Sequence, residues 1–196
     1  MENYFLQGER ILATLKAEGV RPKLLLHSCC APCSSAVIQK LKEFFDITVY
    51  YYNPNVSPVE EYEKRKAEQK RLLSLWHIPL MECDYEGDIY ENAVRGLEKE
   101  PERGKRCNVC FALRLQKTAS AAKKGGYDYF CTTLTVSPHK NADWLNELGE
   151  KAGGRYGVNY LPTDFKKKGG YHRSIELSNE YKLYRQDFCG CKFSKR

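Results

Sequence analysis

The chain of 196 residues has no apolar run close to the roughly 20 residues that a helix needs to cross a bilayer. Residues 1–10 also lack the basic-then-apolar order and the small-residue cleavage site of a secretion signal. These two absences argue against a membrane-spanning or an exported protein. We therefore expect a cytoplasmic protein without a membrane partner.

Internal repeats and inserted linkers are absent as well. Hydrophobic residues make up 42% of the chain and aromatic residues 12%, which is typical of a folded protein and not of a disordered or fibrous one. The length suffices for one hydrophobic core. We expect a single domain over residues 1–196, in which residues 1–22 form an appended N-terminal helix.

Acidic residues are the minority among the charged ones. The chain has 32 lysine and arginine residues against 25 aspartate and glutamate residues, which gives a formal net charge of +7. A charge of this size fits a polyanionic partner such as RNA, and it fits a solvated basic surface equally well.

Strand-like and helix-like segments alternate along the chain. The strands are expected at 23–28, 47–52, 78–83, 129–133 and 158–161, from short runs that are apolar, β-branched or aromatic. The helices are expected at 4–18, 34–45, 58–76, 89–99 and 107–124, with one more between the last two strands. This alternation indicates an α/β fold, in which helices flank a parallel sheet on both faces. A cysteine-bearing C-terminal tail is expected to fold back on it.

Nine cysteines are the most informative feature of the composition. Their odd number and uneven spacing argue against a disulfide framework, whereas clustered cysteines in a reducing compartment are more often metal ligands or redox thiols. Cys29, Cys30 and Cys33 follow the first predicted strand, where open α/β sheets bind their ligands. The glycine-rich phosphate loop of nucleotide-binding relatives is missing at that place. A metal or a cluster is therefore expected where a phosphate would lie.

A second group, Cys107 and Cys110, begins another predicted helix. The Cys-x-x-Cys spacing turns both sulfurs toward one point, so that the pair can bind one metal ion or supply two cluster ligands. Together with Cys29 and Cys30 this pair gives four thiolates, which is a full set for a 4Fe–4S cluster.

The third group is Cys189 and Cys191 in the tail, separated by Gly190. The two are too close to make good tetrahedral corners for zinc, and a disulfide between them would be strained and easily reduced. We expect this pair to do redox work. Cys83 and Cys131 lie in or near apolar strands without a partner close in sequence, and we expect both to be core packing.

Two weaker signals come from loops. Residues 164–174 interleave basic residues with aromatics and glycines, a composition that suits contact with RNA on a flexible loop and also suits a solvated surface. His139 follows a strand and is a candidate acid–base group, although a structural histidine is as common. His27 lies within the first strand and is expected to be a hydrogen-bonded core residue.

With these motifs assembled, the sequence resembles the cobalamin-independent epoxyqueuosine reductase family. The matching segments are 24–33 (LLLHSCCAPC), 51–55 (YYNPN), 60–65 (EEYEKR), 104–114 (GKRCNVCFALR), 132–141 (TTLTVSPHKN), 164–174 (DFKKKGGYHRS) and 183–191 (LYRQDFCGC). They span nearly the whole chain from Leu24 onward and leave out the N-terminal helix.

The resemblance implies that the protein reduces the epoxide of epoxyqueuosine, at the wobble position of tRNA, to give queuosine. It implies a Rossmann-like fold related to the ATP-pyrophosphatase group, and a 4Fe–4S cluster held by Cys29, Cys30, Cys107 and Cys110. The tail pair, Cys189 and Cys191, is then either a redox-active disulfide couple or a pair of ligands to a second iron ion. Cys33 stands where another metal-binding side chain can lie, so that ligation by three thiolates is also open.

The reaction also needs an electron donor, which the sequence does not identify, and an acid that protonates the epoxide oxygen. Asp164 and His139 are candidates for this acid by position. Two other functions compete with this one. A cluster-dependent tRNA thiolation enzyme would need a nucleotide loop after the first strand. A non-catalytic, zinc-stabilised RNA-binding module would leave the Cys29–Cys30 pair and the tail pair without a role.

Overall fold

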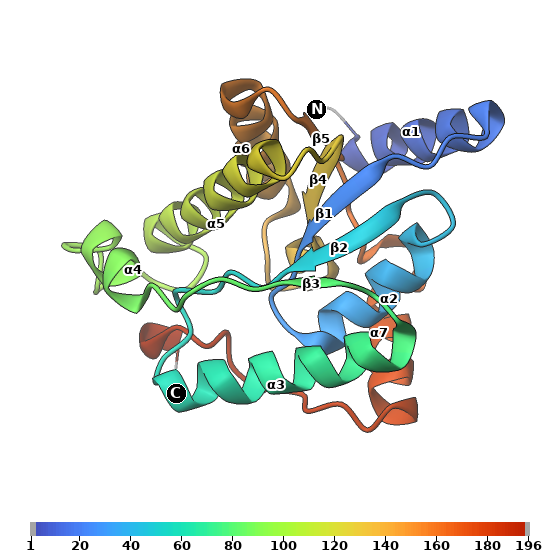
Figure 1. Ribbon diagram of the computed structural model, residues 1–196. Coiled ribbons are helices and arrows are strands. Elements are labelled where there is room, and N and C mark those ends of the chain that lie inside the picture. The colour runs from blue at the N-terminus through green and yellow to red at the C-terminus, as the bar shows by residue number, and fades with distance from the viewer. Residues whose placement is uncertain (1–2, 195–196) are drawn as a thin grey trace.

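A computed structural model describes residues 3–194, and its centre is a five-stranded sheet (Figure 1). The strands are β1 (Lys23–His27), β2 (Asp46–Tyr50), β3 (Leu80–Met81), β4 (Tyr129–Thr132) and β5 (Asn159–Tyr160). All pairings are parallel and the order is β3-β2-β1-β4-β5. The expected α/β fold with a parallel sheet is confirmed. Residues 1, 2, 195 and 196 of the domain expected over 1–196 lie outside the described residues.

Helices cover both faces of the sheet, as Figure 1 shows. They are α1 (Tyr4–Glu18), α2 (Ala31–Leu41), α3 (Val59–Trp76), α4 (Gly87–Ala93), α5 (Lys105–Lys124), α6 (Ala142–Tyr156) and α7 (Gly170–Glu180). Short 3-10 turns are η1 (Thr133–Val136), η2 (Lys167–Gly169) and η3 (Lys192–Ser194). Helices α5 and α6 pack together on one face, and α2 packs with α7 and α3 on the other. No helix within residues 3–194 combines the length and the apolar character that a bilayer span requires.

Burial from both sides explains the sequence of the central strand. Leu24, Leu25 and Leu26 of β1 are all fully buried, so their side chains form a continuous apolar run and not an alternating one. Because β1 and β4 pair in parallel, with His27 opposite Thr132, their carboxyl ends lie side by side at the same edge of the sheet. This edge positions the cysteine turn that follows β1.

Two predicted helix starts were wrong in ways that affect the site. The helix expected from residue 34 begins at Ala31, with Cys30 as its N-cap, because Pro32 is well accommodated in a first helical turn. Cys33 consequently lies within the first turn of α2. The helix expected from residue 107 begins at Lys105, so that Cys107 and Cys110 both lie on α5.

The structure differs from the sequence prediction in smaller ways between β2 and α5 and in the basic segment 164–174. The strand expected over 78–83 is limited to β3, and the helix expected over 89–99 is α4, which begins two residues earlier, at Gly87, and ends at Ala93. The loop expected over 164–174 is largely helical, because η2 and α7 begin within it. Gly169 has a φ of 80°, a left-handed value that glycine adopts without strain, and it connects these two elements.

Candidate functional site: a thiol-lined pocket

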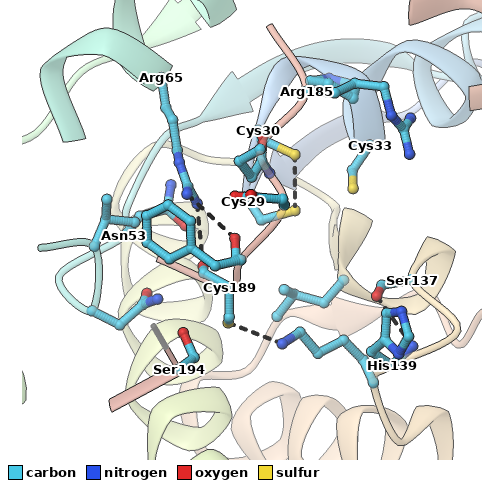
Figure 2. Close-up of a pocket in the computed structure, with 18 of the residues that line it drawn as sticks. Cys29, Cys30, Cys33, Asn53, Arg65, Ser137, His139, Arg185, Cys189 and Ser194 are labelled. Atoms are coloured by element: carbon cyan, nitrogen blue, oxygen red, sulfur yellow. Dashed lines mark hydrogen bonds between the residues drawn. The ribbon is translucent and has the colours of Figure 1, made fainter. Parts of the chain in front are cut away.

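A cavity of about 720 Å³ opens at the carboxyl edge of the sheet. We call it the thiol pocket. Four segments form its wall: the turn after β1 with the start of α2, the chain after β2, the segment between η1 and α6, and the C-terminal tail (Figure 2). In this order they contribute, among others, Cys29, Cys30 and Cys33, then Asn53 and Asn55, then His139 and Lys140, and finally Arg185 and Cys189. Its volume falls in the range of sites that enclose a small molecule or a single nucleoside.

The first thiol group consists of Cys29, Cys30 and Cys33 at the start of α2. Their sulfur atoms all lie within 4.8 Å of one another, and 3.7 Å separates Cys29 Sγ from Cys30 Sγ. Two thiolates bound at about 2.3 Å to one tetrahedral ion lie about 3.8 Å apart, so this spacing suits a thiophilic metal. Within residues 3–194, no other three side chains of the metal-binding types come this close together.

Of the three thiols in this group, only Cys29 has a pKa below its usual value. Hydrogen bonds from Cys30 and then from Cys33 hold the pKa of Cys29 well below its usual value, and Arg114 and Thr133 act in the same direction. The hydrogen bond with Cys29 conversely raises the pKa of Cys30 to about 12. The neighbouring thiols therefore favour the thiolate form of Cys29, which is the form that binds metal.

The second thiol group consists of Cys107 and Cys110 on α5, together with Cys189 of the tail. Burial raises the pKa of Cys107 and raises that of Cys110 to about 11. Lys140 Nζ lies 3.0 Å from Cys189 Sγ. Burial disfavours the charge on Lys140, but the electrostatic interaction with Cys189, and then with Cys110 and Cys107, outweighs this effect and leaves the Lys140 pKa above its usual value.

Arg114 lies between the two thiol groups and is buried. Its guanidinium donates hydrogen bonds to Asn53 Oδ1 and to His27 Nε2, and it lies 4.0 Å from Cys110 Sγ. Burial and the adjacent Arg114 cation lower the pKa of His27 to about 3, so that His27 is neutral and does not repel the guanidinium. No carboxylate within residues 3–194 forms an ion pair with Arg114. Cysteine sulfurs, those of Cys110 and Cys29 first, are the groups that raise the pKa of this buried cation against the effect of burial.

The two tail sulfurs face different surroundings. Cys189 lines the thiol pocket, whereas Cys191 is buried with Tyr90, Val94 and Cys110. The Tyr90 hydroxyl lies 3.0 Å from Cys191 Sγ. All nine cysteines are free thiols in this structure, so the disulfide stays a prediction. The grouping of Cys29 and Cys30 with the α5 pair into one cluster site also stays a prediction.

The two candidate acids, His139 and Asp164, lie in different cavities. His139 lines the thiol pocket, where Arg103 Nη2 lies 2.9 Å from its Nδ1. Asp164 was placed wrongly by the sequence argument, because it is not in the pocket wall and lies in a small cavity beside α1. Its carboxylate is 2.6 Å from Lys166 Nζ.

The cysteines expected to be packing residues lie outside the pocket wall. Cys131 is fully buried in the main core, as predicted. Cys83 is half-buried, and its thiol donates to the Tyr51 carbonyl over 3.1 Å. Sequence reasoning missed the cations Lys140, Arg114 and Arg65, although each lies in one of the motifs quoted above.

A parallel α/β sheet that carries thiols and buried cations in place of a phosphate loop is compatible with a thiol-dependent metal or redox protein. The fold itself is shared with a solved structure described as a predicted subunit of a tRNA methyltransferase from Methanocaldococcus jannaschii. The TM-score is 0.50 at 15% sequence identity, over 78% of this chain and 76% of that one. This likeness concerns the fold alone.

Sequence comparison defines the family. The family model described as "Epoxyqueuosine reductase QueH" matches residues 24–196. Two relatives are named epoxyqueuosine reductase QueH. The protein of Streptococcus pyogenes serotype M1 is 43% identical to this chain, over 99% of this chain and 78% of the relative. The protein of Thermotoga maritima is 34% identical, over 87% of this chain and 89% of the relative. The chain belongs to the epoxyqueuosine reductase QueH family, which confirms the expected resemblance. Because the streptococcal match covers 99% of the chain, it includes α1, which the motifs had left out.

Proposed function

We propose that this protein is the oxidoreductase that converts epoxyqueuosine to queuosine in the wobble position of tRNA. The observation that supports this most directly is the thiol pocket, where the cysteines of the β1–α2 turn and Cys189 of the tail line one cavity on a chain of this family. The cavity is large enough for a single nucleoside turned out of an anticodon loop. We place the reaction in the cytoplasm, where free thiols persist.

The chemistry must deliver two electrons and two protons to the epoxide and release its oxygen as water, leaving an alkene. Oxidation of two thiols to a disulfide supplies these electrons and protons, and Cys189 with Cys191 is the pair that we assign to this step. An electron donor then returns the disulfide to two thiols. A 4Fe–4S cluster, when bound, supplies single-electron transfer for this return.

We assign Cys29, Cys30, Cys107 and Cys110 as the cluster ligands. Three observations support this assignment: the pKa of Cys29 is lowered, the Cys30 sulfur lies beside that of Cys29, and Arg114 provides a buried positive charge near Cys29 and Cys110. Each iron of a cluster takes its own thiolate, so ligands on β1–α2 and on α5 can lie farther apart than ligands of one ion. Lys140 holds Cys189 in the pocket, and His139 is the predicted acid that faces the substrate.

We assign contact with the tRNA backbone to Arg185 in the wall of the thiol pocket, and not to the lysines at 166–168. Lys166 and Lys167 pair with Asp164 at 2.6 and 3.8 Å, so the charge of this run is partly neutralised within the chain. Arg185 is exposed, lines the pocket and donates to Ser178 Oγ over 3.3 Å. It is therefore placed to contact a backbone phosphate next to a tRNA nucleoside that is bound in the cavity.

Replacing Arg185 by Gln is expected to weaken tRNA binding and to reduce the slope of log affinity against log salt by about 0.7 to 1, the effect of one lost phosphate contact. The matched control is Arg173→Gln, because Arg173 pairs with Glu176 at 2.8 Å. Titration of both variants with tRNA at several salt concentrations makes the comparison. Equal slopes in Arg185→Gln and the wild-type protein would remove Arg185 from the interface.

The proposed function can be tested in cells. In a bacterium that lacks its own epoxyqueuosine reductase, tRNA accumulates the epoxide, and expression of this chain is expected to restore queuosine. The nucleosides of total tRNA are measured by mass spectrometry after digestion. Persistence of the epoxide in cells that contain the folded, soluble protein would contradict the proposal.

A further inference from the structure

Helix α3 carries a charged side chain that is almost completely buried. Arg65 has a side-chain exposure of 2%, and its Nε lies 2.6 Å from Glu61 Oε1, one helical turn earlier. Removal of a guanidinium from water is costly, so its remaining donors have to be satisfied within the protein. Both residues lie in the 60–65 motif, whose role the proposed chemistry does not explain.

The remaining donors of Arg65 reach the C-terminal tail. Nη1 lies 3.1 Å from the carbonyl oxygen of Cys189, and Nη2 lies 3.3 Å from that of Phe188 (Figure 2). The guanidinium also lies over the Phe188 ring, 4.9 Å from its centroid. The Ser57 N–H donates to the next carbonyl, that of Gly190, over 2.9 Å. Three successive carbonyls of the tail are therefore held by donors of α3 and of the segment just before it.

These contacts fix the direction of the tail thiol. With the carbonyls of Phe188 and Cys189 held on the α3 side, Cys189 Sγ lies 3.0 Å from Lys140 Nζ on the pocket side. The turn also depends on Gly190, which has a φ of 99°. A Cβ atom there would lie 2.7 Å from Arg65 Nη1 and 3.1 Å from Val56 Cγ2. The glycine thus provides both the left-handed backbone and the room for the guanidinium.

We propose that Arg65 is a positioning residue for the tail thiols: its guanidinium clamps the carbonyls of Phe188 and Cys189, and this directs Cys189 Sγ into the thiol pocket. The inference rests on the proposed function in that it assigns redox chemistry to Cys189. Arg65 acts through the backbone of the tail. The ion pair with Glu61 holds the guanidinium in the orientation that this clamp requires.

The test compares two arginines of the same helix. Arg71 also pairs with a glutamate, Glu68, and also donates to two tail carbonyls, those of Tyr181 and Lys182, but it does so upstream of the cysteines. Arg65→Met is expected to speed hydrogen exchange in residues 186–194 and to lower kcat roughly 100-fold, the scale of an ångström-sized misplacement, with KM for tRNA within about twofold of wild type. Arg71→Met is expected to leave kcat and this exchange unchanged.

Two further variants complete the test on the anaerobically purified protein. Arg65→Lys keeps the charge beside Glu61 but loses the two-carbonyl fork, and it is expected to fall between wild type and Arg65→Met. Gly190→Ala perturbs the clamp from the tail side and is expected to reproduce the loss of kcat and the faster exchange, even if Arg65→Met does not fold.

The inference would be overturned by wild-type kcat in Gly190→Ala and Arg65→Met, or by loss of kcat without any change in exchange at 186–194. Hydrogen exchange needs no turnover. A wild-type protein that does not reduce the epoxide would therefore refute the proposed function, while unchanged exchange in Arg65→Met would separately refute the clamp.

Discussion

Cys189→Ser is expected to lower turnover of tRNA epoxyqueuosine by at least about 10³-fold while the iron content of the protein stays at the wild-type value. The serine hydroxyl occupies the same position beside Lys140, 3.0 Å away in the wild-type protein, but it forms no disulfide and carries no two-electron redox chemistry. A loss of this size is the scale for removal of a group that takes part in the reaction. Anaerobic turnover and iron analysis of the same preparation measure both quantities.

The same variant, with Cys191→Ser, separates the two roles considered for the tail pair. A redox couple predicts that both variants keep all their iron and that thiol trapping finds the wild-type pair cycling between reduced and bonded states. A pair of ligands to a second iron predicts the loss of one iron per protein, and thiols that resist trapping until a chelator is added. Cys83→Ser is the matched control, since Cys83 is half-buried and lies outside the thiol pocket. Full activity in the Cys189→Ser, Cys191→Ser double variant would remove the pair from the site.

Cys29→Ala and Cys107→Ala are each expected to lose the cluster and, with it, activity. Because binding free energy of a metal group adds to folding free energy, both variants should also unfold at lower denaturant concentration than the iron-loaded wild type. Iron and sulfide analysis, visible absorption and denaturant titration measure these effects. Cys131→Ala is the control, which should keep its iron at a packing cost of about 1 kcal/mol.

Cys33→Ala distinguishes between ligand sets. The assignment to Cys29, Cys30, Cys107 and Cys110 predicts that Cys33→Ala retains the cluster. A cluster or ion held by the first thiol group alone predicts the reverse pattern, in which Cys33→Ala loses iron and Cys107→Ala keeps it. Wild-type iron content in Cys107→Ala would contradict the assignment made here.

The sheet was predictable because its strands are buried on both faces, which produces continuous apolar runs such as Leu24 to Leu26. The position of the site followed from this, since ligands bind at the carboxyl edge of a parallel sheet. The start of α2 was less predictable. Serine is a good N-cap, but Pro32 allows the helix to begin earlier, and this brings Cys33 to Cys29 and Cys30.

The buried cations could not be predicted in the same way. Arg65 lies in a helix rich in charged residues and Arg114 in one with basic residues at both ends, where any single arginine suggests a solvated face. Both are buried by contact with segments that are distant in sequence. Arg65 donates a hydrogen bond to the carbonyl of Cys189 in the tail, and Arg114 donates one to Asn53 Oδ1. Asp164 failed for a related reason, because its carboxylate is engaged by the lysines that follow it.

The central claim is tested most directly by a single turnover without oxygen. The purified protein is reconstituted with iron and sulfide, reduced chemically, mixed with tRNA that carries epoxyqueuosine, and the tRNA is then digested for mass spectrometry of its nucleosides. We predict that epoxyqueuosine disappears and that a nucleoside lighter by one oxygen atom, queuosine, appears in equal amount. An unchanged epoxide, with a protein that is folded and contains its iron, would contradict the account.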